Sequence, residues 1–157
     1  MVETRIIIGY LADYPNMIPI CASWSYGQWS YHSNGTLEHT LTRFTKGANK
    51  ERLPFTLVAL DNQKPVGMIS LWKSDLDNRP DLSPWLASLY VHPFYRGRHI
   101  SSSLIEKMEI EARRLGYLRL FLVTEEAKTI YIKHGWEELE QVKTGHGNAS
   151  LMSKGLL

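Results

Sequence analysis

An apolar run without polar alternation, Trp85–Val91, lies between two prolines in the middle of the chain. Such a run is typical of a strand that is buried on both faces of a sheet. The stretch 101–115 then predicts a helix, because apolar residues recur along one face and Gly116 provides a C-terminal stop. A second apolar run, Leu118–Thr124, predicts another strand. Strand, helix and strand in this order predict a crossover unit packed on a sheet.

Apolar spacing also predicts the other elements of the fold. Phe55–Leu60 and Val66–Trp72 are two further runs, and the first is closed by the four polar residues 61–64, so the pair predicts a β-hairpin. The remaining predicted elements are helices at 16–28, 36–46 and 127–134 and strands at 136–142 and 149–154. Together these elements predict an α/β fold built on a mixed sheet.

Composition excludes several classes of protein. With 157 residues, the chain is long enough for one domain over residues 1–157 that buries a core without a metal or a disulfide. Its only cysteine, Cys21, excludes an internal disulfide framework and a cysteine-based zinc cluster. A net charge of +2 is far from the basic surplus of a dedicated nucleic-acid binder. The apolar stretch Ile6–Ala12 is short for a signal peptide, and no run approaches a membrane helix, so we expect a cytoplasmic protein with no membrane partner.

The loop between the buried strand and the long helix is basic and contains Gly97. The first amides of a helix have no internal partner, and its N-terminus carries a partial positive charge. Because Arg96 and Arg98 add two more charges, this loop fits a phosphate or pyrophosphate. It equally fits a plain connection with solvated arginines, and the loop alone does not decide between the two.

The wider pattern favours the first interpretation. The motif Val-x-Pro-x-Tyr-Arg-Gly at 91–97 precedes a helix, a leucine-rich strand and Tyr-x-x-x-Gly-Trp at 131–136. This arrangement resembles the GCN5-related N-acetyltransferase (GNAT) superfamily over about 54–156. The resemblance implies a GNAT-like fold: a central, mostly antiparallel sheet with splayed parallel strands and flanking helices. The family's loop falls on 96–101, with His99 in the place of a glycine and Ser101 in the place of glycine or alanine.

The histidine in this loop has a physical consequence. Glycine reaches positive φ and allows the backbone to come close to a ligand. Histidine tolerates the left-handed region better than most residues, so His99 can keep the shape of the loop. Its ring could crowd a pyrophosphate or donate a hydrogen bond to it.

The resemblance also implies a cosubstrate and a reaction. Acetyl-CoA would donate an acetyl group to a primary amine of a small molecule or a peptide. Its pyrophosphate would bind main-chain amides from 98–101, and its pantetheine arm would lie between the strands 85–91 and 118–124 like an added strand. The predicted cofactor-binding residues are Leu89, Val91, Arg96, Gly97, Arg98, His99, Ile100, Ser101 and Ser102.

Tyr131 matches the family's frequent proton donor. A phenol with a reference pKa near 10 is protonated at neutral pH and can donate to the departing thiolate. The alternative is that Tyr131 only packs against its apolar neighbours Ile130 and Trp136. The general base stays open, because Ala87 and Ser88 stand where many relatives carry a carboxylate. The candidates are Asp75, Asp77, Asp81, Glu125, Glu126 and a water held by Ser88.

Aromatic residues crowd the first half of the chain. Most of them are expected in the core, and some could line a pocket for a cationic amine. The residues in question are Trp24, Tyr26, Trp29, Tyr31, Trp72 and Trp85. A second hypothesis is a CoA-binding regulatory or interaction module that has lost catalysis. We expect no metal and no nucleic-acid partner, and a homodimer stays open.

Overall fold

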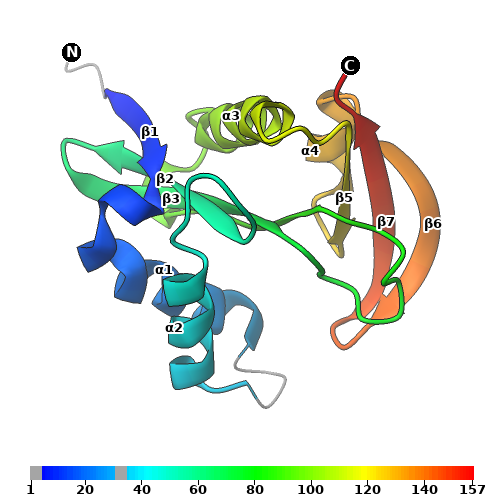
Figure 1. Ribbon diagram of the computed structural model, residues 1–157, viewed down its shortest axis with the longest axis horizontal. Helices are drawn as coiled ribbons and strands as arrows, with labels where there is room; N and C mark the ends of the chain where they lie inside the picture. The colour runs from blue at the N-terminus through cyan, green and yellow to red at the C-terminus, as the bar shows by residue number, and fades with distance from the viewer. Residues whose placement is uncertain (1–4, 31–34) are drawn as a thin grey trace.

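The computed structural model describes residues 5–30 and 35–157. Within these ranges, seven strands form one mixed sheet in the order β1-β2-β3-β4-β5-β7-β6 (Figure 1). The strands are β1 (Ile6–Tyr10), β2 (Phe55–Asp61), β3 (Lys64–Trp72), β4 (Trp85–Val91), β5 (Arg119–Thr124), β6 (Glu137–Thr144) and β7 (Gly147–Gly155). The helices are α1 (Ile18–Ser25), α2 (Leu37–Lys46), α3 (Ile100–Arg114) and α4 (Lys128–Lys133). The predicted α/β fold with a mixed sheet is confirmed.

The predicted hairpin is present as β2 and β3, which pair antiparallel. Asn62 and Gln63 form its turn with φ values of 50° and 69°, as a type I′ turn requires. The strand β1, which pairs antiparallel with β2 at the edge of the sheet, is not among the elements predicted from the sequence. A short edge strand gives little periodicity from which to predict it.

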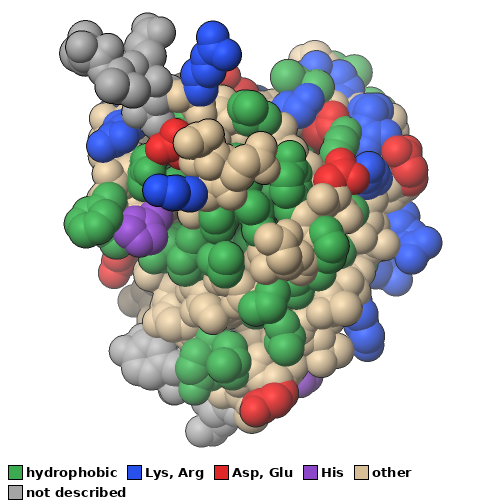
Figure 2. All heavy atoms as spheres, turned by 90° about the vertical axis from the view of Figure 1, so that its left-hand side faces the viewer, with side chains coloured by type: hydrophobic (Ala, Val, Ile, Leu, Met, Phe, Trp, Pro, Cys, Tyr) green, Lys and Arg blue, Asp and Glu red, His purple; other side chains and the backbone are tan. Residues whose placement is uncertain are grey.

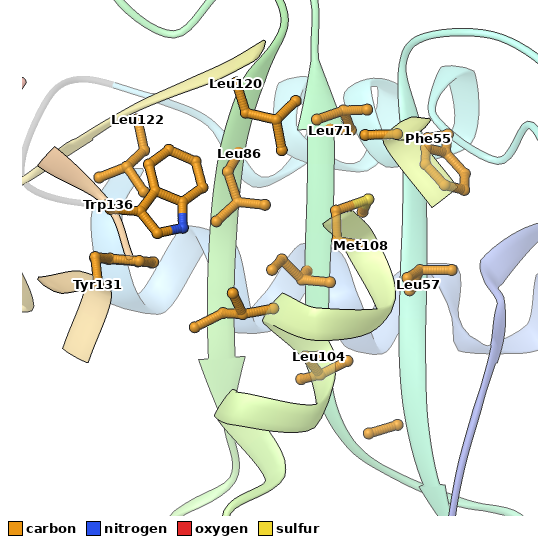
Figure 3. Packing of buried hydrophobic residues seen from close by; sticks show 14 of the residues in the cluster. Phe55, Leu57, Leu71, Leu86, Leu104, Met108, Leu120, Leu122, Tyr131 and Trp136 are labelled. Atoms are coloured by element: carbon orange, nitrogen blue, oxygen red, sulfur yellow. The ribbon is translucent and has the colours of Figure 1, made fainter. Parts of the chain in front are cut away.

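Helices cover both faces of the sheet (Figure 1). Successive residues of β2 alternate between the two sides: Leu57 packs in the cluster under α3, and Val58 packs in the cluster under α1 and α2. On the α3 side, Leu104 and Met108 are fully buried against the strands (Figure 3). This alternation confirms the expectation that the middle strands are buried on both faces. Seen from the side of β1 and β2, hydrophobic side chains gather in the middle of the surface, and Lys and Arg lie mainly around its margin (Figure 2).

The two parallel strands β4 and β5 separate almost at once. Their pairing is limited to Trp85 with Phe121. A register shift between β3 and β4 occurs opposite Ser88, whose φ is 55°. Residues 85–87 of β4 are buried, whereas residues 88–91 are only partly buried. The prediction of full burial is therefore wrong for the second half of β4, because β5 diverges from it and leaves this edge of the strand without a neighbour.

The C-terminal part completes the sheet. After α4, β6 and β7 form an antiparallel hairpin, and β7 lies between β5 and β6. Most residues of β6 are exposed, because it is an edge strand. In the part of the chain that the structure describes, no helix has the length and apolar character to cross a membrane.

Candidate active site

A cleft of about 1340 Å³ opens where β4 and β5 diverge. The loop that leads into α3 lines one end of it, and the loop between β3 and β4 together with the turn between β6 and β7 lines another part. Residues from β4, the end of β5 and α4 lie between them. Six segments from different parts of the chain thus contribute to one space.

His99 is the residue before the first turn of α3, and its φ and ψ of 62° and 19° place it in the left-handed region. The histidine therefore keeps a backbone conformation that glycine adopts easily, as the sequence analysis expected. Gly97 is left-handed as well, with a φ of 79°. The helical hydrogen bonds start with the Ser103 amide, which donates to the His99 carbonyl at 3.1 Å. The preceding amides of α3 have no partner within the helix.

The two arginines of the loop are held by aromatic rings. The Arg96 Nε donates to the Val91 carbonyl at 2.9 Å, and its guanidinium lies 5.7 Å from the Tyr90 ring. Arg98 lies 5.0 Å from the Tyr95 ring, and the Tyr95 hydroxyl donates to Asp61 at 2.7 Å. The Arg96 cation, together with the first amides of α3 that have no partner within the helix, fits an anion such as the pyrophosphate of CoA.

Most of the predicted cofactor-binding residues come together in this cleft. Those that line it are Leu89, Val91, Arg96, Gly97, His99, Ile100 and Ser101. Arg98 and Ser102 do not line it. The Ser102 Oγ lies 3.1 Å from the His134 Nε2 and so links α3 to the C-terminal end of α4.

Tyr131, on α4, also lines the cleft, and its side chain is 7% exposed. Its ring packs edge-on against Trp136, with 5.9 Å between centroids, beside Leu122 and Leu86 (Figure 3). The Tyr131 hydroxyl makes no hydrogen bond with a described residue. Every side-chain N or O among these residues that is fully buried does have a partner, so this hydroxyl is not fully buried. Because Tyr131 lines the cleft, its hydroxyl opens into that space. Burial, and secondly the negative charge of Asp75, raise the pKa of Tyr131 above its usual value, so the phenol is protonated at neutral pH.

A partly buried ion pair places the end of α4. The carboxylate of Glu109 accepts hydrogen bonds from Lys154 at 2.6 Å and from the Trp136 indole at 3.3 Å. Lys154 also donates to the His134 carbonyl at 2.5 Å. Because the carbonyl of Tyr131 accepts the amides of His134 and Trp136, this network fixes the turn that follows the tyrosine. Sequence reasoning missed it, since Glu109 and Lys154 lie far apart in the chain.

Asp75, in the loop between β3 and β4, is a partly buried carboxylate in the wall of the cleft. Burial raises its pKa to about 7, although the cation of Arg43 on α2 acts to lower it. The nearby carboxylates of Glu125 and Asp77 contribute to the same increase. The Arg43 guanidinium lies 5.0 Å from the Trp72 ring, which holds the cation on this side of the cleft.

The other candidate bases are less enclosed. Asp77, Glu125 and Glu126 line the cleft but are exposed. Asp81 does not line it; its carboxylate pairs with Arg79 at 3.1 Å, which lowers its pKa. Among the described residues, no group of three or more His, Cys, Asp or Glu side chains is arranged to hold a metal ion.

The aromatic residues divide between core and cleft. Trp29 and Trp72 line the cleft, whereas Trp85 is fully buried in the core. Trp24 does not line the cleft and stacks on Tyr90 at 5.1 Å. Tyr26 also lies outside the lining. Tyr31 lies outside the described residues.

Three solved structures show how widely this fold occurs. An aminoglycoside 6′-N-acetyltransferase complexed with coenzyme A has a TM-score of 0.77 and 16% identity, over 96% of this chain and 97% of that one. The N-acetyltransferase from Staphylococcus aureus Mu50 has a TM-score of 0.75 and 14% identity, over 98% and 100%. Ard1 from Thermoplasma volcanium has a TM-score of 0.71 and 17% identity, over 97% and 98%. At these identities the likeness shows the fold.

The sequence itself shows the family. No curated protein sequence is significantly similar to this chain. The family model of the acetyltransferase (GNAT) domain, however, matches residues 53–138, which is more than half of the chain. The resemblance stated from the sequence motifs is thus confirmed: the chain belongs to the GNAT family of acetyltransferases.

Proposed function

We propose that the protein transfers the acetyl group of acetyl-CoA to a primary amine of a small molecule or a peptide. The observation that carries this proposal is the cleft itself. A cationic helix N-terminus lines one end, and the open hydroxyl of Tyr131 faces the same space. An enzyme of this kind needs both a site for the pyrophosphate and a proton donor near the thioester.

The phosphate end would hold the cosubstrate through its backbone. The amides of Ile100 and Ser101 have no partner within the helix and suit the pyrophosphate, with Arg96 beside them. Beyond Trp85, β4 is not paired with β5, so the main chain around Leu89 is available to the pantetheine arm. The carbonyl of Val91 is already bonded to Arg96. Leu89 therefore carries more of this role than Val91.

Tyr131 would act on the leaving group. As the amine nitrogen bonds to the acetyl carbon, the bond between carbon and sulfur breaks and the sulfur becomes negative. The phenol is protonated at neutral pH, and in a partly enclosed cleft its O–H stabilises this charge and supplies the proton. The open hydroxyl of Tyr131 supports an enzyme over a CoA-binding module without catalysis.

The test is a thiol-release assay with acetyl-CoA and a panel of amines: amino sugars, polyamines, amino acids and short peptides. We expect CoA release above the hydrolysis rate with at least one class, together with an acetylated amine in the mass spectrum. If acetyl-CoA binds but no amine on the panel is acetylated, the catalytic proposal gives way to the interaction module.

A further inference from the structure

We propose that Asp75 is the general base of the acetyl transfer, the group that accepts the proton from the attacking amine nitrogen. The inference rests on the proposed function. The family model and the structural likeness assign no base, and β4 has Ala87 and Ser88 in place of the expected carboxylate. The loop between β3 and β4 brings a different carboxylate to the same space.

The position of Asp75 supports this role. Asp75 and Tyr131 line one cleft, and they are close enough for the charge of Asp75 to raise the pKa of the tyrosine. No described residue makes a hydrogen bond or an ion pair with the Asp75 carboxylate. Among the described residues, every side-chain oxygen that is fully buried has a hydrogen-bond partner. The Asp75 carboxylate has none, so it is not fully buried and is accessible from the cleft. An amine that enters the cleft can therefore reach it.

The surroundings of Asp75 suit a base at neutral pH. Burial raises its pKa to about 7, close to the pH at which a general base is most effective. Four groups on other elements or on its own loop face it: Arg43 from α2, Glu125 at the end of β5, Tyr131 from α4 and Asp77. Of these groups, the Arg43 cation lowers the pKa of Asp75 and so favours its ionised form, the carboxylate that can accept a proton.

The competing carboxylates lack this combination. Asp77 and Glu126 are exposed. Glu125 is exposed too, and its Oε1 accepts a hydrogen bond from the Thr144 hydroxyl at 3.2 Å. Asp81 is paired with Arg79. Asp75 alone among the candidates is partly buried, unpaired and in the wall of the cleft.

The proton inventory of the reaction balances with these two residues. The bond between nitrogen and the acetyl carbon forms, and the proton on nitrogen moves to the carboxylate of Asp75. The bond between carbon and sulfur breaks, and the Tyr131 phenol gives its proton to the sulfur. Asp75 is then a carboxylic acid and Tyr131 a phenolate. The proton returns from Asp75 to Tyr131 through the solvent of the open cleft, so no further reactant is needed.

The test is the pH dependence of kcat/KM in wild type and in Asp75→Asn, a substitution that keeps the shape and removes the base. In wild type, we expect kcat/KM to fall below about pH 7 with a slope of one. In Asp75→Asn, the plateau falls by about 100-fold or more and the acid limb disappears. Asp75→Glu retains a titrating limb. Acetyl-CoA affinity, measured by calorimetry, stays at the wild-type level and shows that each variant is folded.

Asp77→Asn is the matched control, because it removes a carboxylate from the same loop. It retains the acid limb, which moves to lower pH because a charge that raises the pKa of Asp75 is gone. A wild-type rate and an unchanged limb in Asp75→Asn would overturn the proposal. Failure of the proposed function gives a different result, because the wild-type protein would then acetylate no amine at any pH. In that case both the proposed acetyl transfer and the role of Asp75 would be wrong.

Discussion

The two ends of the cleft are built in opposite ways. The end that suits the pyrophosphate comes from one continuous segment, 91–101, in which a strand end, a cationic loop and a helix N-terminus follow one another. The other end is assembled from α2, the loop between β3 and β4, the end of β5 and the turn between β6 and β7. It carries charges of both signs and two indole rings. Acetyl-CoA would thus bind to a site formed by one continuous segment, which we call the continuous end. The amine would bind to a site formed by several distant segments, which we call the composite end.

This difference has a practical consequence. A substitution in the continuous segment should change acetyl-CoA affinity and leave the pH profile alone. A substitution in the composite end should change the pH profile or the rate and leave acetyl-CoA affinity alone. A variant that changes both quantities would break the division.

Tyr131→Phe is expected to have the largest effect. The phenyl ring keeps its packing against Trp136 but loses the open hydroxyl, so turnover should fall by about 100-fold or more. Acetyl-CoA affinity should stay within about twofold of wild type. Steady-state kinetics and calorimetry measure the two quantities. Unchanged turnover would remove Tyr131 from the chemistry and leave it a packing residue.

Asp75→Asn is expected to stabilise the fold at alkaline pH. The folded pKa of about 7 lies above the unfolded pKa of 3.8, so the carboxylate destabilises the native state increasingly as pH rises from about 4 to 7. An amide avoids this penalty. The free energy of unfolding at pH 8 should rise by on the order of 1–3 kcal/mol, and the gain should vanish near pH 4. Urea unfolding at both pH values measures it, and an equal change at the two would contradict the titration of Asp75.

Arg43→Gln is expected to have a smaller effect, on the pH profile. Removing this cation takes away the influence that lowers the pKa of Asp75. The acid limb of kcat/KM should move upward by on the order of half a pH unit. The matched control is Lys46→Gln, which removes an exposed cation from the last turn of the same helix. Equal shifts in the two variants would point to a general charge effect.

His99→Gly is expected to have the smallest effect. Glycine adopts the observed φ of 62° without strain, so acetyl-CoA affinity should equal that of wild type or improve slightly. Calorimetry decides the matter. A marked loss of affinity would show instead that the imidazole donates to the ligand.

The sequence predicted the continuous end far better than the composite one. The loop 96–101 could be interpreted because its charges, its glycine and the following helix are neighbours in the chain. Asp75 is only one of several candidates in the sequence, since its burial depends on elements that are distant in the chain, and no local pattern reports that. The hydrogen bonds of Glu109 with Trp136 and Lys154 escaped prediction for the same reason. The strand β1 escaped because five residues at a sheet edge carry too little pattern.

Calorimetric titration of acetyl-CoA into wild type and into Asp75→Asn tests the account most directly. The account predicts one site per chain with a dissociation constant in the micromolar range and the same value for both proteins. That result would place the cosubstrate in the continuous end, independent of the composite one. Absence of binding to wild type at millimolar acetyl-CoA would contradict the account at its base, because the loop 96–101 would then hold no pyrophosphate.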